Sequence, residues 1–228
     1  MSPQVVAEVI EAAVHGRYLV RPAAAGASPL LVTFHGYAEN AERNLEAVME
    51  VPGVHNWTVV AVQALHPFYN AKTGEVVASW MTKLDREAAI VDNTRYVAEI
   101  VRRVRSTLGN PEVLVYAGFS QGTAMAYRAA AAGHSSRGVV ALAGDLPPEL
   151  AEKRLQGFPP VLIGRGEADE WYTHEKVERD LALLEAMGAP VEICVFEGGH
   201  EWTGEFRRRC GEFLRRCLGA ALTSTTGC

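Results

Sequence analysis

A serine between two glycines, in the motif Gly118-Phe119-Ser120-Gln121-Gly122, constrains the fold of this chain more than any other feature. Residues 113–117 are apolar and β-branched, as in a buried strand, and residues 123–132 are rich in alanine, as in a helix. A G-x-S-x-G motif at such a strand-to-helix turn lifts the serine hydroxyl clear of the sheet edge. The plainer alternative is a glycine-rich turn with an N-capping serine. The strand and helix on either side favour a nucleophile at Ser120.

Strands and helices alternate along the rest of the chain. The alternation predicts a mostly parallel, doubly wound sheet with helices on both faces and right-handed crossovers. Apolar runs predict strands at 30–34, 58–62, 138–143, 160–164 and 190–196, and helices at 40–50, 86–108 and 174–187. A final helix is expected after His200 and ends near residue 218.

Other segments complete the predicted organisation. Residues 9–14 and 18–21 flank His15-Gly16 and predict an N-terminal antiparallel hairpin. Residues 64–84 are expected to form a long irregular loop of the kind that is usually functional. A length of 228 residues fits one α/β domain over 1–228, with a polar tail at 223–228 that is expected to fray.

Composition indicates the cellular compartment of the protein and excludes some classes of binding partner. A formal net charge of −5 does not attract nucleic acid. The sequence has no apolar run long enough to span a membrane, and Met1-Ser2-Pro3-Gln4 lacks the basic start of a signal peptide. The four cysteines lack metal-ligand spacing, and Cys210 and Cys217, seven apart on one helix face, are expected to be buried thiols. These features predict a reduced, cytoplasmic protein without a metal.

A serine nucleophile needs a base, and the base needs an orienting carboxylate. Asp169 follows the predicted strand at 161–164, and His200 follows the last predicted strand. The chain order Ser, Asp, His is that of the α/β-hydrolases. Asp145 also follows a strand and remains an alternative acid, whereas His134, His174 and Asp180 lie in less suitable positions.

The negative oxygen that forms during acyl transfer needs two backbone donors. The residue after the nucleophile, Gln121, supplies one N–H. The second is expected from the turn His35-Gly36-Tyr37 after the first parallel strand, with the N–H of Tyr37 as the donor.

Four segments together resemble the phospholipase/carboxylesterase family of small serine hydrolases, which includes acyl-protein thioesterases and bacterial carboxylesterases. They are Phe34-His35-Gly36, the serine motif, Gly166-Glu167-Ala168-Asp169 and Gly198-Gly199-His200. The resemblance spans about residues 29–218. It implies an α/β-hydrolase fold with no lid domain, a triad of Ser120, Asp169 and His200, and hydrolysis of esters or thioesters without a cofactor.

The sequence departs from that family beside two of these residues. Glu170-Trp171-Tyr172 replaces a Val-Pro type segment, and Glu201-Trp202 follows the histidine. The lipid-like substrates of the family therefore do not transfer directly. Residues 144–159 are too few for a helical lid. Aromatic residues near the strand ends predict a shallow apolar groove for a short acyl or aromatic ester, with substrate-binding residues Phe68, Trp80, Phe119, Trp171 and Trp202.

The sequence thus predicts a serine carboxylesterase that acts on short-chain or aromatic esters, thioesters included, through an acyl-enzyme on Ser120. A lactone hydrolase similar to dienelactone hydrolase is one alternative, although those enzymes usually carry a cysteine nucleophile. Another is a hydrolase-fold protein that binds a small molecule without turnover. A dehalogenase would need an aspartate at position 120, and Gly164-Arg165-Gly166 lacks the third glycine of a nucleotide site. The oligomeric state stays open, a homodimer included.

Overall fold

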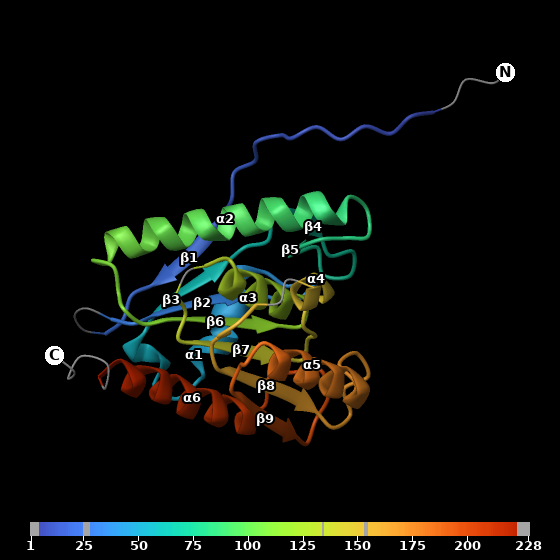
Figure 1. Ribbon diagram of the computed structural model, residues 1–228. Helices are drawn as coiled ribbons and strands as arrows, with labels where there is room; N and C mark the ends of the chain where they lie inside the picture. Colours follow the sequence, from blue (N-terminus) through green and yellow to red (C-terminus); the bar gives the residue numbers. More distant parts are fainter. Residues whose placement is uncertain (1–4, 25–27, 134, 153–154, 223–228) are drawn as a thin grey trace.

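A seven-stranded sheet forms the centre of the molecule in the computed structural model, which describes residues 5–24, 28–133, 135–152 and 155–222 (Figure 1). The strand order is β1-β3-β2-β6-β7-β8-β9. Neighbouring strands are parallel except β1 and β3, which are antiparallel, so the predicted mostly parallel sheet is confirmed. The strands are β1 (Tyr18–Arg21), β2 (Leu30–Phe34), β3 (Thr58–Val62), β6 (Leu114–Phe119), β7 (Gly138–Leu142), β8 (Val161–Gly166) and β9 (Val191–Phe196).

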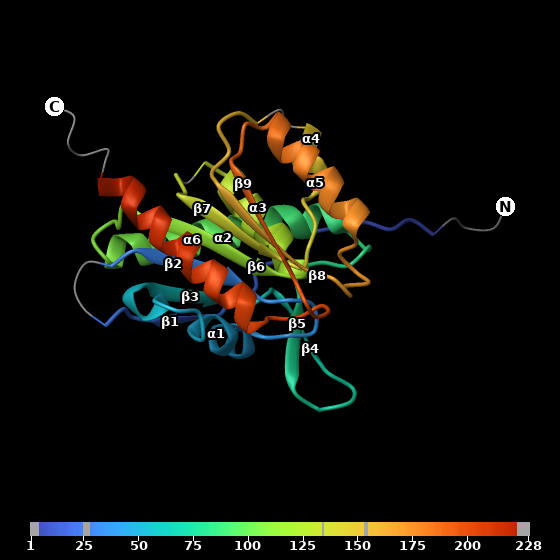
Figure 2. The ribbon, with the colours of Figure 1, turned by 90° about the horizontal axis from the view of Figure 1, so that it is seen from below.

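Helices cover both faces of this sheet, as predicted. They are α1 (Ala41–Met49), α2 (Arg86–Thr107), α3 (Gln121–Ala131), α4 (Pro148–Glu152), α5 (His174–Ala186) and α6 (Gly204–Leu222), with a 3₁₀ turn, η1 (Val54–Asn56). Side chains alternate along each strand, so Leu30 and Val32 enter one core while Leu31 enters the other. The first core includes residues of α2, α3 and α5, and the second includes residues of α1 and α6, the face seen in Figure 2.

The predicted N-terminal hairpin is wrong. Residues 9–14 form no strand, and β1 pairs with β3 instead. The chain turns toward α2 at Gly16, where a Cβ would lie 2.0 Å from the Tyr96 ring, and the Tyr96 hydroxyl donates to the Arg17 carbonyl. These contacts direct the preceding residues away from β1, and Figure 1 shows them leaving the body of the molecule.

The segment predicted to be irregular contains a small hairpin. Strands β4 (His66–Tyr69) and β5 (Val76–Ser79) pair antiparallel, with His66 opposite Ser79. Pro67 hid this hairpin from the sequence pattern, since proline within an apolar run argues against a central strand. Proline is tolerated here because β4 pairs only with β5 in a two-stranded sheet.

Several smaller expectations can be compared with the structure. The thiols of Cys210 and Cys217 are buried on α6, as predicted. Within the described part of the segment between β7 and β8, α4 is five residues long, which agrees with a molecule that has no lid domain. None of the described helices combines the length and apolarity of a membrane span. The tail at 223–228 lies outside the described residues, and one domain over 1–228 stays a prediction.

Candidate active site

Ser120 occupies the sharp turn that joins β6 to α3. Its φ of 53° and ψ of −120° lie in a region that L residues rarely adopt, and such strain is typical of functional turns. The flanking glycines permit the turn, because a Cβ on Gly118 would lie 2.4 Å from the carbonyl oxygen of Gly122. A Cβ on Gly122 would lie 2.2 Å from the carbonyl oxygen of Phe34. The strand-turn-helix predicted from the motif is therefore present.

His200 lies between Ser120 and Asp169 and contacts both. Its Nε2 is 2.8 Å from the Ser120 Oγ, and its Nδ1 is 3.0 and 3.1 Å from the two carboxylate oxygens of Asp169. Asp169 lies in the loop after β8 and His200 in the loop after β9, both at the carboxyl edge of the sheet. The two loops pack closely, since a Cβ on Gly166 would lie 2.2 Å from the carbonyl oxygen of Gly199.

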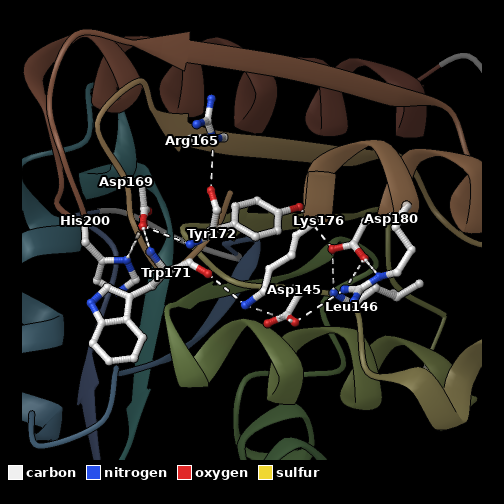
Figure 3. Close-up of polar contacts among 10 residues, drawn as sticks. Asp145, Leu146, Arg165, Asp169, Trp171, Tyr172, Lys176, Asp180 and His200 are labelled. Carbon is white, nitrogen blue, oxygen red and sulfur yellow. Dashed lines mark hydrogen bonds and ion pairs between the residues drawn. The ribbon is translucent and has the colours of Figure 1, made fainter. Parts of the chain in front are cut away.

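The carboxylate of Asp169 is removed from solvent and held by backbone donors. Its side chain is fully buried. The N–H groups of Trp171 and Tyr172 donate to Oδ1 at 2.8 and 2.9 Å (Figure 3). With His200 these contacts satisfy a buried charge, which would otherwise be costly. They also hold the carboxylate in place so that it contacts the Nδ1 atom of the His200 imidazole.

The alternative residues are bound elsewhere. Asp145 pairs with Arg179 at 3.3 Å and Lys176 at 3.8 Å, and within the described residues it has no hydrogen bond to His200. His174 is exposed and faces Glu178. His134 lies outside the described residues.

The turn after β2 lies against the serine. A Cβ on Gly36 would be 3.3 Å from the Cβ of Ser120. The N–H of Gln121 is at the first position of α3, where no helical carbonyl can accept it. No acceptor within the described residues is bound by the N–H of Tyr37. The N–H groups of Tyr37 and Gln121, the two predicted donors, therefore have no hydrogen-bond acceptor among the described residues.

Two neighbouring side chains fix this turn. Glu39, which sequence reasoning missed, accepts the N–H of Gly36 at 2.7 Å, and burial raises the pKa of its carboxyl group. The Nδ1–H of His35 donates to the carbonyl of Gly36 at 2.7 Å, and its Nε2 accepts the N–H of Ala64 at 3.1 Å. Burial lowers the pKa of His35 to about 4, so both contacts are made by a neutral ring.

The side chain of Gln121 is a second feature that the motif did not reveal. Its Oε1 accepts the N–H of Trp80 at 2.9 Å, and its Nε2 donates to the carbonyl of Met81 at 2.9 Å. The amide thus binds the end of the β4–β5 hairpin segment to the start of α3. The only sequence signal was a glutamine at the variable position of the motif.

A pocket of about 230 Å³ opens beside Ser120 and His200. Met81 and Trp171 contribute to its lining, as do Asp145 and Lys176, so it is partly apolar and partly charged. Larger hollows of 400 to 440 Å³ are lined by residues away from Ser120. We assign the site by its reactive side chains rather than by size. Among the described residues no cluster of His, Cys, Asp or Glu is arranged to hold a metal ion.

The predicted aromatic residues occupy different places around the site. Trp171 is 74% exposed and lines the pocket. Phe119 lies behind the imidazole, with ring centres 5.1 Å apart, and Trp202 packs beyond it. Phe68 packs against Tyr37 with the two rings tilted, and it is not among the residues that line the pocket. Trp80 needs a correction, because it is fully buried in the core and its indole N–H donates to the carbonyl of His35.

Comparisons with known proteins agree with this architecture. The model of the phospholipase/carboxylesterase family matches residues 15–218. Among solved structures, esterase PE8 superposes with a TM-score of 0.72 at 21% identity, covering 90% of this chain and 100% of PE8. Acyl-protein thioesterase 2 from Zea mays gives 0.70 at 20% identity, over 90% and 100% of the two chains. The Bacillus cereus carboxylesterase gives 0.69 at 18% identity, over 89% and 94%. At these identities the structures show the fold alone, and no curated protein matches the chain.

Proposed function

The chain belongs to the phospholipase/carboxylesterase family, and from that premise we propose that it is a serine carboxylesterase. Ser120 Oγ attacks the ester carbonyl while His200 Nε2 takes the hydroxyl proton. The tetrahedral intermediate collapses, and His200 returns the proton to the leaving alcohol. Water, activated by the same imidazole, then attacks the acyl-enzyme and releases the acid and free Ser120.

The observation that carries this proposal is the continuous hydrogen-bonded row from Ser120 through His200 to Asp169. The contact of 2.8 Å between Ser120 Oγ and His200 Nε2 is short enough for direct proton transfer. Asp169 contacts the opposite nitrogen, which favours the tautomer whose Nε2 is free to accept a proton. No cofactor enters these steps.

The backbone N–H groups of Tyr37 and Gln121 form the proposed oxyanion hole. Both are close to Ser120 in the chain or in space and have no described acceptor of their own. Each such donor typically stabilises the transition state by about 3 kcal/mol. Glu39 and His35 act on this turn indirectly, by holding Gly36.

The proposed substrates are short-chain or aromatic carboxylic esters, thioesters included. A pocket of about 230 Å³ favours small groups over long acyl chains. The exposed indole of Trp171 supplies an aromatic surface at its edge. Phe119 and Trp202 support His200 from behind, so we propose that they shape the site rather than contact the substrate.

The test is hydrolysis of p-nitrophenyl esters from acetate to palmitate by the wild type and by Ser120→Ala. We expect the highest kcat/KM on short or aromatic esters and a loss of about 10³-fold or more in the variant. Equal hydrolysis by both proteins would contradict the nucleophile assignment. No turnover of any ester, thioester or lactone would instead favour the binding protein.

A further inference from the structure

Asp180 is a buried carboxylate close to the active site for which the proposed reaction has no use. It lies in the middle of α5, and its side chain is fully buried. An α-helix packed on a sheet needs no charge at such a position, and burying one is costly unless its oxygens are bound. The contacts of this carboxylate therefore indicate its role.

The two oxygens of Asp180 bind three different groups (Figure 3). Oδ2 accepts the backbone N–H of Leu146 at 2.8 Å and the hydroxyl of Tyr172 at 3.1 Å. Oδ1 accepts hydrogen bonds from Arg179 at 2.8 and 3.1 Å. A single oxygen thus joins the loop after β7 to the loop after β8.

Both of these loops contribute directly to the site. The loop after β7 provides Ala143, Gly144 and Asp145 to the pocket wall. The first residue of this loop, Ala143, has a strained backbone with a φ of 56°. Such a conformation persists only where the surrounding structure holds it. The loop after β8 carries Asp169, and the Tyr172 that Asp180 binds also donates its N–H to the Asp169 carboxylate.

We propose that Asp180 is a positioning residue for ester hydrolysis, which fixes the pocket wall at Leu146 and the Asp169 loop at Tyr172. The proposal rests on the proposed function for its chemistry. Loss of the carboxylate removes one tether from each loop at once. Displacements of about 1 Å at a catalytic group can lower rates by about 10²-fold.

Two substitutions separate positioning from simple packing. Asp180→Val removes both acceptors and leaves the Leu146 N–H and the Tyr172 hydroxyl buried without a partner. Asp180→Asn keeps an oxygen that can accept from both. The matched control is Tyr127→Phe, because the Tyr127 hydroxyl is buried with no partner among the described residues and its removal frees neither loop.

The experiment measures kcat and KM for p-nitrophenyl acetate and the NMR signal of the His200 Nδ1 proton, at temperatures where melting curves show each variant folded. We expect Asp180→Val to lower kcat at least about tenfold and to move or broaden the His200 signal. Asp180→Asn should stay within about threefold of the wild type, and Tyr127→Phe should match it.

A folded Asp180→Val protein with unchanged kcat and an unchanged His200 signal would overturn the proposal, as would an equal loss in Asp180→Asn. If Asp180→Val does not fold, Tyr172→Phe decides the question. It removes one of the two tethers, so it should lower kcat by about threefold, and wild-type kinetics would overturn the proposal. Should the wild type hydrolyse no ester, the proposed function fails. The His200 signal still reports whether Asp180 holds the Asp169 loop.

Discussion

At the scale of single residues, His35 couples the turn beside Ser120 to pH. Both of its ring nitrogens are bound, and burial lowers its pKa from 6.5 to about 4. Below pH 6.5 the unfolded chain therefore takes up a proton that the native chain does not. The stabilisation, about 3 kcal/mol, is complete above pH 6.5 and is lost as the pH falls toward 4.

We expect the free energy of unfolding to fall more steeply between pH 6.5 and 4 in the wild type than in His35→Gln. Urea unfolding of both proteins across this range measures the difference, and other acidic groups cancel in the comparison. Parallel pH profiles would show that His35 does not carry this dependence.

The residues around the site differ in how far their positions could be predicted. Ser120, Asp169 and His200 each follow a predicted strand, and parallel strands bring their carboxyl ends to one edge, so their proximity could be predicted from order alone. Glu39, Gln121 and Asp180 could not be assigned roles this way. All three bind backbone N–H groups that are distant in sequence or brought close by a turn, and Asp180 also binds the Tyr172 hydroxyl. No local sequence pattern encodes such pairs.

At the scale of elements, the Gln121 side chain joins α3 to the segment after β5. It binds the backbone of Trp80 and Met81, and Met81 lines the pocket. Gln121→Ala keeps the backbone N–H of the proposed oxyanion hole but releases this segment. We expect KM to rise severalfold while kcat changes less.

Steady-state kinetics on a short ester test this expectation. Thr82→Ala is the control, because within the described residues the Thr82 hydroxyl contacts only the main chain of Leu84 and does not bind Gln121. A fall in kcat at constant KM would mean that the amide acts on the reaction itself.

The elements that sequence predicted wrongly share one physical cause. Strong apolar runs at 30–34 and 138–143 became strands because both of their faces are buried. Residues 9–14 and 64–84 have weaker patterns, and tertiary contacts decide them. Tyr96 on α2 determines the path of the chain at Gly16, while Pro67 is tolerated because its strand has a single partner.

At the scale of the whole molecule, the segment between β7 and β8 borders the site, and its residues 143–145 line the pocket. Its described residues contain the short α4, and Trp171 at the pocket is exposed. Because the described residues of this segment form no lid, we expect the rate on a partly soluble ester to saturate smoothly with concentration. Rates measured across the solubility limit of such an ester test this. An abrupt rise once droplets form would show that an interface activates the enzyme.

The central claim, that Ser120 is the nucleophile, is tested most directly by labelling with a fluorophosphonate, followed by mass spectrometry of the peptides. We predict a single adduct on Ser120, no adduct in Ser120→Ala, and much slower labelling in His200→Ala, because the imidazole takes the hydroxyl proton. An adduct on another residue, or undiminished ester hydrolysis by a protein that does not label, would contradict the account.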